Sequence, residues 1–156
     1  MMTKLRLLCV LAALSLCSVA SAQTAACPWL TEGTASALLD GRVAVTTRIL
    51  SAGDSTCTFT LQQGAATSVL EISIAATDHF ICPPNSLKVS GIGNEAVSCT
   101  QGHPPNETMD IVSGRARNLY FGVRLTVTGK PSAALSPSMR QSLVEQVAEQ
   151  VAGNLY

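Results

Sequence analysis

The sequence predicts an α+β domain: an antiparallel sheet of about six strands, with a short N-terminal helix and a C-terminal amphipathic helix packed on one face. Three observations lead to this fold class. Runs of alternating apolar and polar residues follow one another without helical segments between them, which favours antiparallel strands. Apolar residues recur at three- and four-residue steps near the two ends of the domain, which is typical of helices. Residues that favour turns separate the runs.

The first predicted element is a short helix over residues 32–39. Thr31 suits the N-cap position, because its hydroxyl can accept a hydrogen bond from a free N–H of the first turn. Asp40-Gly41 is a typical helix end. The expected buried stripe of this helix consists of Ala35, Leu38 and Leu39.

Three strands are expected next. Residues 43–49 form the first, with Val43, Val45 and Ile49 on one face. Residues 57–61 and 69–75 both alternate, and the Gly-containing segment between them predicts a hairpin. The inward side chains of this hairpin are Cys57, Phe59, Leu61, Leu70, Ile72 and Ile74.

Residues 77–93 lose the alternation, and we predict an irregular loop there. The six residues from Gly91 to Ala96 follow the Gly-x-Gly-x-x-Ala pattern of a dinucleotide site. That site needs a helix after the pattern, whereas a strand-like run follows here. We interpret the glycines as a tight turn and expect no cofactor.

The remaining strands are predicted at residues 95–100, 108–113 and 118–128, with Met109 and Ile111 of the second facing inward. Residues 118–128 carry the longest alternation in the chain, so we expect them to form the central strand. The apolar face of this strand carries Leu119, Phe121, Val123, Leu125 and Val127. The opposite face carries Tyr120, Gly122, Arg124, Thr126 and Thr128.

The last predicted element is an amphipathic helix that starts at Pro137, with Ser136 as its N-cap. Arg140 is expected on its polar side. The apolar stripe expected to face the sheet is Met139, Leu143, Val144, Val147, Ala148, Val151 and Ala152.

The N-terminus has the pattern of a secretory signal peptide. Lys4 and Arg6 precede an apolar run, and Ala20-Ser21-Ala22 is a small-residue cleavage site. We predict cleavage after Ala22, so that residues 1–22 are the signal and residues 23–156 form a single disulfide-stabilised domain. The alternatives are an uncleaved membrane anchor and lipidation at Cys17. Residues 23–156 contain no apolar stretch long enough to cross a membrane.

Four cysteines lie beyond the signal: Cys27, Cys57, Cys82 and Cys99. An even number of cysteines in an exported chain favours two disulfides. Three pairings are possible, and we favour the sequential one, Cys27–Cys57 and Cys82–Cys99. A four-thiolate zinc site is the alternative, although these cysteines lack the Cys-x-x-Cys spacing that such sites prefer.

No catalytic, metal or cofactor site is predicted. The formal net charge is zero and basic residues do not cluster, which disfavours nucleic acid as a partner. The histidines are His79 and His103, and neither Ser90 nor Ser98 has the flanking glycines of a nucleophile elbow. A metal site on Asp78, His79 and His103 is a minor alternative, and Asn106-Glu107-Thr108 is a glycosylation sequon.

Several short motifs together resemble a bacterial, actinobacterial-type family of exported proteins and lipoproteins, domain of unknown function 3558. The motifs are Cys27-x-x-Leu30-Thr31, Gly41, Cys57-Thr58-Phe59 and Gly91-Ile92-Gly93-Asn94-Glu95-Ala96, followed by the alternating strand and the closing helix. Asn94 and Phe59 stand where the family usually has Asp and Trp. The resemblance implies a Cys27–Cys57 disulfide and an envelope location, and it implies no activity.

These features together predict a secreted or periplasmic, non-catalytic binding module whose partner is a protein or small ligand of the envelope. The candidate binding surface is the polar face of the sheet, and its candidate residues are Thr58, Glu71, Tyr120 and Arg124. An inhibitor of a secreted enzyme, acting through a loop braced between Cys82 and Cys99, is the first alternative. A hydrolase or a metal-dependent enzyme is the second.

Overall fold

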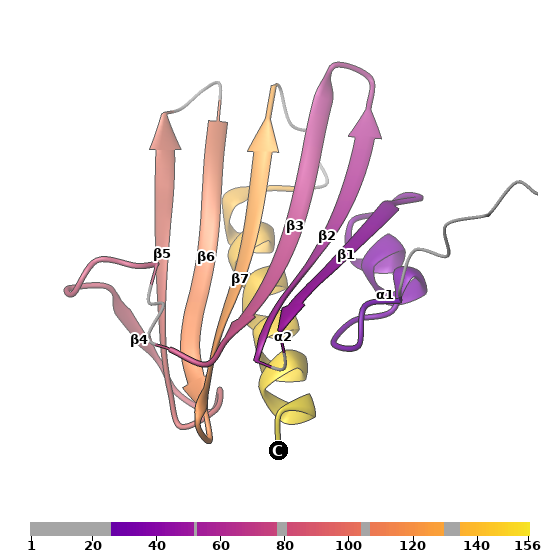
Figure 1. The fold of residues 1–156 in the computed structure, drawn as a ribbon. Helices are drawn as coiled ribbons and strands as arrows, with labels where there is room; N and C mark the ends of the chain where they lie inside the picture. Colours follow the sequence, from indigo (N-terminus) through magenta and orange to yellow (C-terminus); the bar gives the residue numbers. More distant parts are fainter. Residues whose placement is uncertain (1–25, 52, 78–80, 104–106, 130–134) are drawn as a thin grey trace, which may run out of the picture.

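The computed structural model describes residues 26–51, 53–77, 81–103, 107–129 and 135–156. One seven-stranded antiparallel sheet runs through it, in the spatial order β1-β2-β3-β7-β6-β5-β4 (Figure 1). The elements are α1 (Glu32–Leu38), β1 (Ala44–Ser51), β2 (Asp54–Gln63), β3 (Ala66–Ala75), β4 (Leu87–Val89), β5 (Glu95–His103), β6 (Glu107–Ala116), β7 (Leu119–Thr128) and α2 (Pro137–Asn154).

The α+β class is confirmed, but the sheet has seven strands rather than about six. The additional strand is β4, which lies inside the segment predicted to be an irregular loop and pairs with β5 through Leu87, Lys88 and Val89. Three residues are too few to show an alternating pattern, so this strand depends on its partner rather than on its own sequence.

Residues 119–128 form β7, the central strand of the sheet, as predicted. β7 pairs with β3 on one side and with β6 on the other, so it joins the β1-β2-β3 meander to the β4-β5-β6 meander. Phe121, Val123 and Leu125 are almost completely buried on the face covered by the helices. We call this the core face, and the opposite face the open face.

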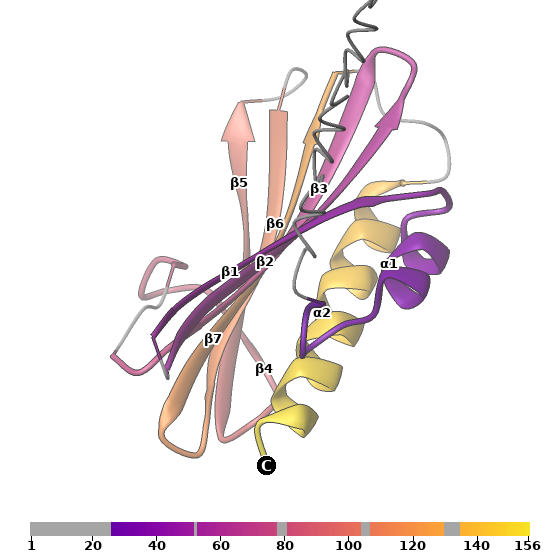
Figure 2. The same cartoon turned by 45° about the vertical axis from the view of Figure 1, so that its right-hand side comes forward.

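Both helices lie on the core face (Figure 2). The N-cap of α1 is Thr31, whose hydroxyl accepts from the Thr34 N–H at 3.1 Å. Asp40, just beyond α1, adopts a φ of 57°, as a helix stop requires. Ser136 occupies the predicted N-cap position of α2, but its hydroxyl makes no capping hydrogen bond.

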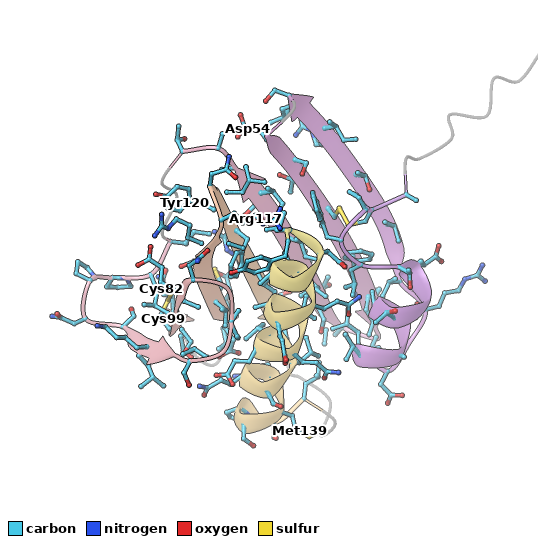
Figure 3. The ribbon with its side chains drawn as sticks, turned by 90° about the horizontal axis from the view of Figure 1, so that it is seen from below. Asp54, Cys82, Cys99, Arg117, Tyr120 and Met139 are labelled. Atoms are coloured by element: carbon cyan, nitrogen blue, oxygen red, sulfur yellow. A yellow bond between two sulfur atoms is a disulfide. The ribbon has the colours of Figure 1, made fainter. Side chains whose placement is uncertain are left out.

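Two positions of α2 contradict the predicted stripe. Met139, in the first turn of α2 (Figure 3), is 55% exposed, whereas Arg140 is only 7% exposed. Arg140 is buried because its Nε donates to Asp110 Oδ2 at 2.6 Å and its NH1 donates to the Leu135 carbonyl at 3.1 Å. Asp110 also accepts from the Thr100 hydroxyl at 2.8 Å, which completes a buried polar anchor between α2, β6 and β5.

The predicted orientation of β6 is wrong. Val112 opposes Val123 of β7, so Val112 and Asp110 face α2, while Met109 and Ile111 lie on the open face. Ile111 is nevertheless 1% exposed, because a loop covers that part of the open face. A strand that is buried on both faces does not alternate in polarity, and so its sequence does not indicate which side faces the helix.

Replacing Arg140 with Ala should strongly destabilise the fold, because the Asp110 carboxylate would remain buried without its cation. We expect a loss of about 3–5 kcal/mol in the free energy of unfolding, measured by urea denaturation. The exposed Arg48→Ala variant is the control, with a change within about 0.5 kcal/mol. Arg140→Met combined with Asp110→Leu should recover most of the loss; equal stabilities of Arg140→Ala and wild type would contradict the anchor.

Candidate functional site

Three of the four predicted binding residues form one row across the open face. Thr58 of β2 opposes Glu71 of β3, and Glu71 opposes Arg124 of β7. All three side chains are half-buried. We call Thr58, Glu71 and Arg124 the cross-strand row. Because neighbouring strands lie about 4.8 Å apart, the row presents three polar groups within the reach of one small ligand or one partner side chain.

The Arg124 guanidinium is only partly engaged. Its NH1 lies 3.6 Å from Glu71 Oε1, and the two side chains are 32% and 35% exposed. A strong charge-assisted hydrogen bond has a donor–acceptor distance of about 2.7–2.9 Å, so this ion pair is loose. Within the described part of the chain, the Arg124 Nε is buried without a hydrogen-bond acceptor. The Nε is not reachable from solvent, but the side chain is 32% exposed and its ion pair is loose, so its guanidinium could still receive an incoming carboxylate or phosphate.

Tyr120 does not join the cross-strand row. It lies four residues before Arg124 on β7, in a separate row between Ala75 and Arg115. Four residues of a strand span roughly 13 Å. The intervening position is Gly122, where an added Cβ would lie 3.1 Å from Ile81 Cδ1. The Ile81 side chain therefore lies over the strand between Tyr120 and Arg124 and separates them.

Ile81 belongs to a segment that crosses the open face, and we call residues 81–86 the strap. The strap is held by the Cys82–Cys99 disulfide (Figure 3). It is also held by a hydrogen bond from Gln101 Nε2 to the Ile81 carbonyl at 3.3 Å. The Cys82 Sγ lies 3.9 Å from the Ile111 carbonyl oxygen. The strap thus covers the β5–β6 side of the open face. The cross-strand row lies next to the strap and is not covered by it.

Both favoured cysteine pairings are present. Cys27–Cys57 has a Cα–Cα distance of 5.7 Å, and Cys82–Cys99 has one of 5.8 Å. Cys27 and Cys57 are buried, and this disulfide ties the segment before α1 to the core face of β2. Two disulfides of this kind are typical of oxidising, extracellular compartments. Of the helices that the structure describes, none is long and apolar enough to span a membrane.

The described residues give no support to a metal site or a dinucleotide site. Asp78, His79 and Asn106 lie outside them. In residues 26–156, apart from the undescribed gaps, no group of three His, Cys, Asp or Glu side chains could hold a metal ion. Gly91 and Gly93 have φ values of 86° and 62°, and they form a turn that leads into β5. A strand rather than a helix follows these glycines, which contradicts a dinucleotide site.

The sequence does not predict two hollows that the structure contains, one beside β1 and one at the end of the core face between β1 and β7. One hollow of about 420 Å³ is lined by Leu30, Glu32, Arg42, Val43 and Val45, among others. Another of about 220 Å³ is lined mainly by Pro28, Trp29, Ile49, Ile74 and Leu119. Both depend on the placement of the segment before α1 against β1, a long-range contact that no local pattern reveals.

The fold and site define a disulfide-linked α+β domain with a seven-stranded antiparallel sheet and one partly open polar face. No known protein family matches the chain, and no curated protein matches it. Among solved structures, the crystal structure of Ara h 8.0201 shares 11% identity over 80% of this chain and 81% of that chain, with a TM-score of 0.23. This structural similarity is too weak to support a conclusion about fold or function. The resemblance to the exported family of unknown function remains a prediction.

Removing the strap disulfide should loosen the strap without unfolding the sheet. For the double variant Cys82→Ala, Cys99→Ala we expect a loss of about 3 kcal/mol in the free energy of unfolding, the cost typical of a disulfide loop of this length. Hydrogen exchange should accelerate at the amides of residues 81, 82, 85 and 86, since Pro83 and Pro84 have none, and stay slow in β3 and β7. Unchanged exchange in residues 81–86 would show that the disulfide does not hold the strap.

Proposed function

We propose that the protein is a secreted or periplasmic, non-catalytic binding module that holds an anionic group of its ligand at the cross-strand row. The observation that supports this proposal is the state of Arg124. Its side chain is 32% exposed, its ion pair with Glu71 is loose at 3.6 Å, and its buried Nε has no acceptor within the described residues. A carboxylate or phosphate could approach from solvent and compete with Glu71 for the loosely held guanidinium.

The surroundings of Arg124 favour binding over catalysis. The row lies on the rigid centre of a sheet, so little conformational freedom would be lost when a ligand docks. The strap beside it supplies a raised border that would orient a ligand along β2, β3 and β7. Thr58 adds a hydroxyl, which can donate to or accept from the ligand, and Glu71 can accept from an N–H or O–H group.

The proposed location is the bacterial envelope or the extracellular space. Residues 1–22 would be removed as a signal peptide after Ala22. The Cys27–Cys57 and Cys82–Cys99 disulfides support an oxidising compartment.

A second candidate function is inhibition of a secreted enzyme. The observation that favours it is the exposure of Pro83, Pro84 and Asn85 in the strap, directly after the anchored Cys82. A braced loop of this kind can enter an active site with little ordering cost. Inhibition through this loop would disappear in the Cys82→Ala, Cys99→Ala variant, while binding at Arg124 would remain.

Replacing Arg124 with Ala should abolish capture of the ligand. Wild-type protein, Arg124→Ala and Arg115→Ala, each immobilised, would be exposed to envelope and culture extracts of the producing cell. Arg115 is a matched control, because it lies on the same face and already pairs with Glu95 at 2.9 Å. We expect wild type and Arg115→Ala to retain the same species. Arg124→Ala should retain at least tenfold less of it, because a charged hydrogen-bonding partner has been removed. Equal retention by Arg124→Ala would place the site elsewhere.

The intact mass of the secreted protein tests its processing. We expect a chain that begins at Gln23 and gains the mass of two hydrogen atoms for each disulfide on reduction. A chain that retains residues 1–22, or a mass unchanged by reduction, would contradict the proposed export. A mass increase at Cys17 would indicate lipidation.

A further inference from the structure

We propose that the outer edge of β1 is a self-association surface, and that its partner is β1 of a second copy of this chain. The two strands would pair antiparallel about a twofold axis at Thr47. This inference goes beyond the proposed function, since it concerns the edge of the sheet rather than the cross-strand row.

β1 is a weakly protected edge, because its only protecting features along Ala44–Ser51 are one charge and a register irregularity between Ile49 and Ser51. Within the described residues it pairs only with β2, so the N–H and C=O groups along its other side are available. Ile49 and Leu50 are 64% and 70% exposed, the two most exposed large apolar side chains of any strand in the described residues. Native edge strands usually carry charges, prolines or covering segments, because a free apolar edge pairs with other strands. Arg48 is the one charge on β1.

The opposite edge of the sheet is less suited to pairing. β4 contains three residues, Leu87–Val89, and offers too few backbone groups for a stable ladder. It also leads at once into the turn at Gly91, which has a positive φ of 86°. Leu87 is 63% exposed and so resembles Ile49 in exposure, but it lies at the end of this short strand.

Symmetry limits how two β1 strands can pair. A twofold axis perpendicular to the sheet keeps both helix layers on the same side. Directly opposed residues of an antiparallel pair share a face, so a core-face residue must oppose a core-face residue of the other copy. The axis must therefore pass through a residue rather than between two residues. The central candidates are Thr46, Thr47 and Arg48.

Charge and burial select Thr47 among these residues. An axis at Arg48 would place two guanidinium groups directly opposite each other, which destabilises a pair. An axis at Thr46 would place Ile49 opposite Val43, which is already buried, and Leu50 opposite Arg42. An axis at Thr47 places Arg48 opposite Thr46 on the open face.

The same axis brings Ile49 of each copy to a hollow on the other copy. Val45 and Ile49 both lie on the core-face side of β1, since they oppose Phe59 and Ser55 of β2. With the axis at Thr47, Ile49 of each copy opposes Val45 of the other. It would enter the 420 Å³ hollow between Val45, Val43 and Leu30. Ile49 also lines the 220 Å³ hollow of its own copy, so this side chain would lie between a hollow of each copy.

The paired strands would also extend the cross-strand row. Thr46 opposes Thr58 in the β1–β2 ladder, so Arg48 of the second copy would lie next to Thr46 at the end of the row. The result is a continuous sheet in which the cross-strand rows of two copies run in opposite directions. Because only one short strand pairs on each side, we expect a reversible, concentration-dependent dimer.

Sedimentation velocity over a concentration series tests the dimer. We expect the wild-type protein to shift from the monomer to the dimer mass, and Ile49→Lys to weaken the dimer at least tenfold, because a charge would replace the residue that fills the hollow. Leu87→Lys is the matched control and should dimerise as wild type does. Circular dichroism and the retained disulfides verify that each variant is folded. A wild-type monomer at every concentration, or a loss of dimer in Leu87→Lys alone, overturns the proposal.

Disulfide trapping tests the register. Thr46→Cys and Arg48→Cys place thiols on the open face, away from the native disulfides of the core face and the strap. An equimolar mixture of the two variants should form a cross-linked dimer readily, because these positions oppose each other across the axis at Thr47. Each variant alone should cross-link far less. Preferential cross-linking of Thr46→Cys with itself, or no cross-link above that of an Ala76→Cys control, overturns the assigned register.

Discussion

The pairing of β3 with β7 is the constraint on which the rest of the structure depends. It joins two meanders that are far apart in sequence, and its register fixes the face of every side chain in both. With Ile72 opposite Val123, the apolar residues of both strands lie on the core face, and Glu71 and Arg124 meet on the open face. A shift by one residue would place the Arg124 charge in the core.

The sequence predicted the elements whose two faces differ in environment. β2, β3 and β7 each have one face under the helices and one face near solvent, so alternation indicated both their existence and their orientation. Alternation did not indicate the orientation of β6, because the strap covers the open face there and buries Ile111. The burial of Arg140 was not predicted for a related reason, because it depends on Asp110, a partner 30 residues away on another element.

The candidate site shows the same division between local and long-range information. Alternation placed Thr58, Glu71, Tyr120 and Arg124 on one face, and the structure agrees. Alternation could not show that three of them share a row while Tyr120 lies apart, because that depends on register between strands. Nor could it show that Ile81 intervenes, since the strap is positioned by the Cys82–Cys99 disulfide and not by local preference.

The two proposed binding surfaces lie on the same side of the open face, and its asymmetry accounts for this. The strap closes the half of the face formed by β5 and β6, and the disulfide makes that closure permanent under oxidising conditions. The half that stays open runs from Arg124 on β7 to the free edge of β1. A ligand at the cross-strand row and a second copy at β1 would therefore use adjoining, non-overlapping parts of one rigid surface.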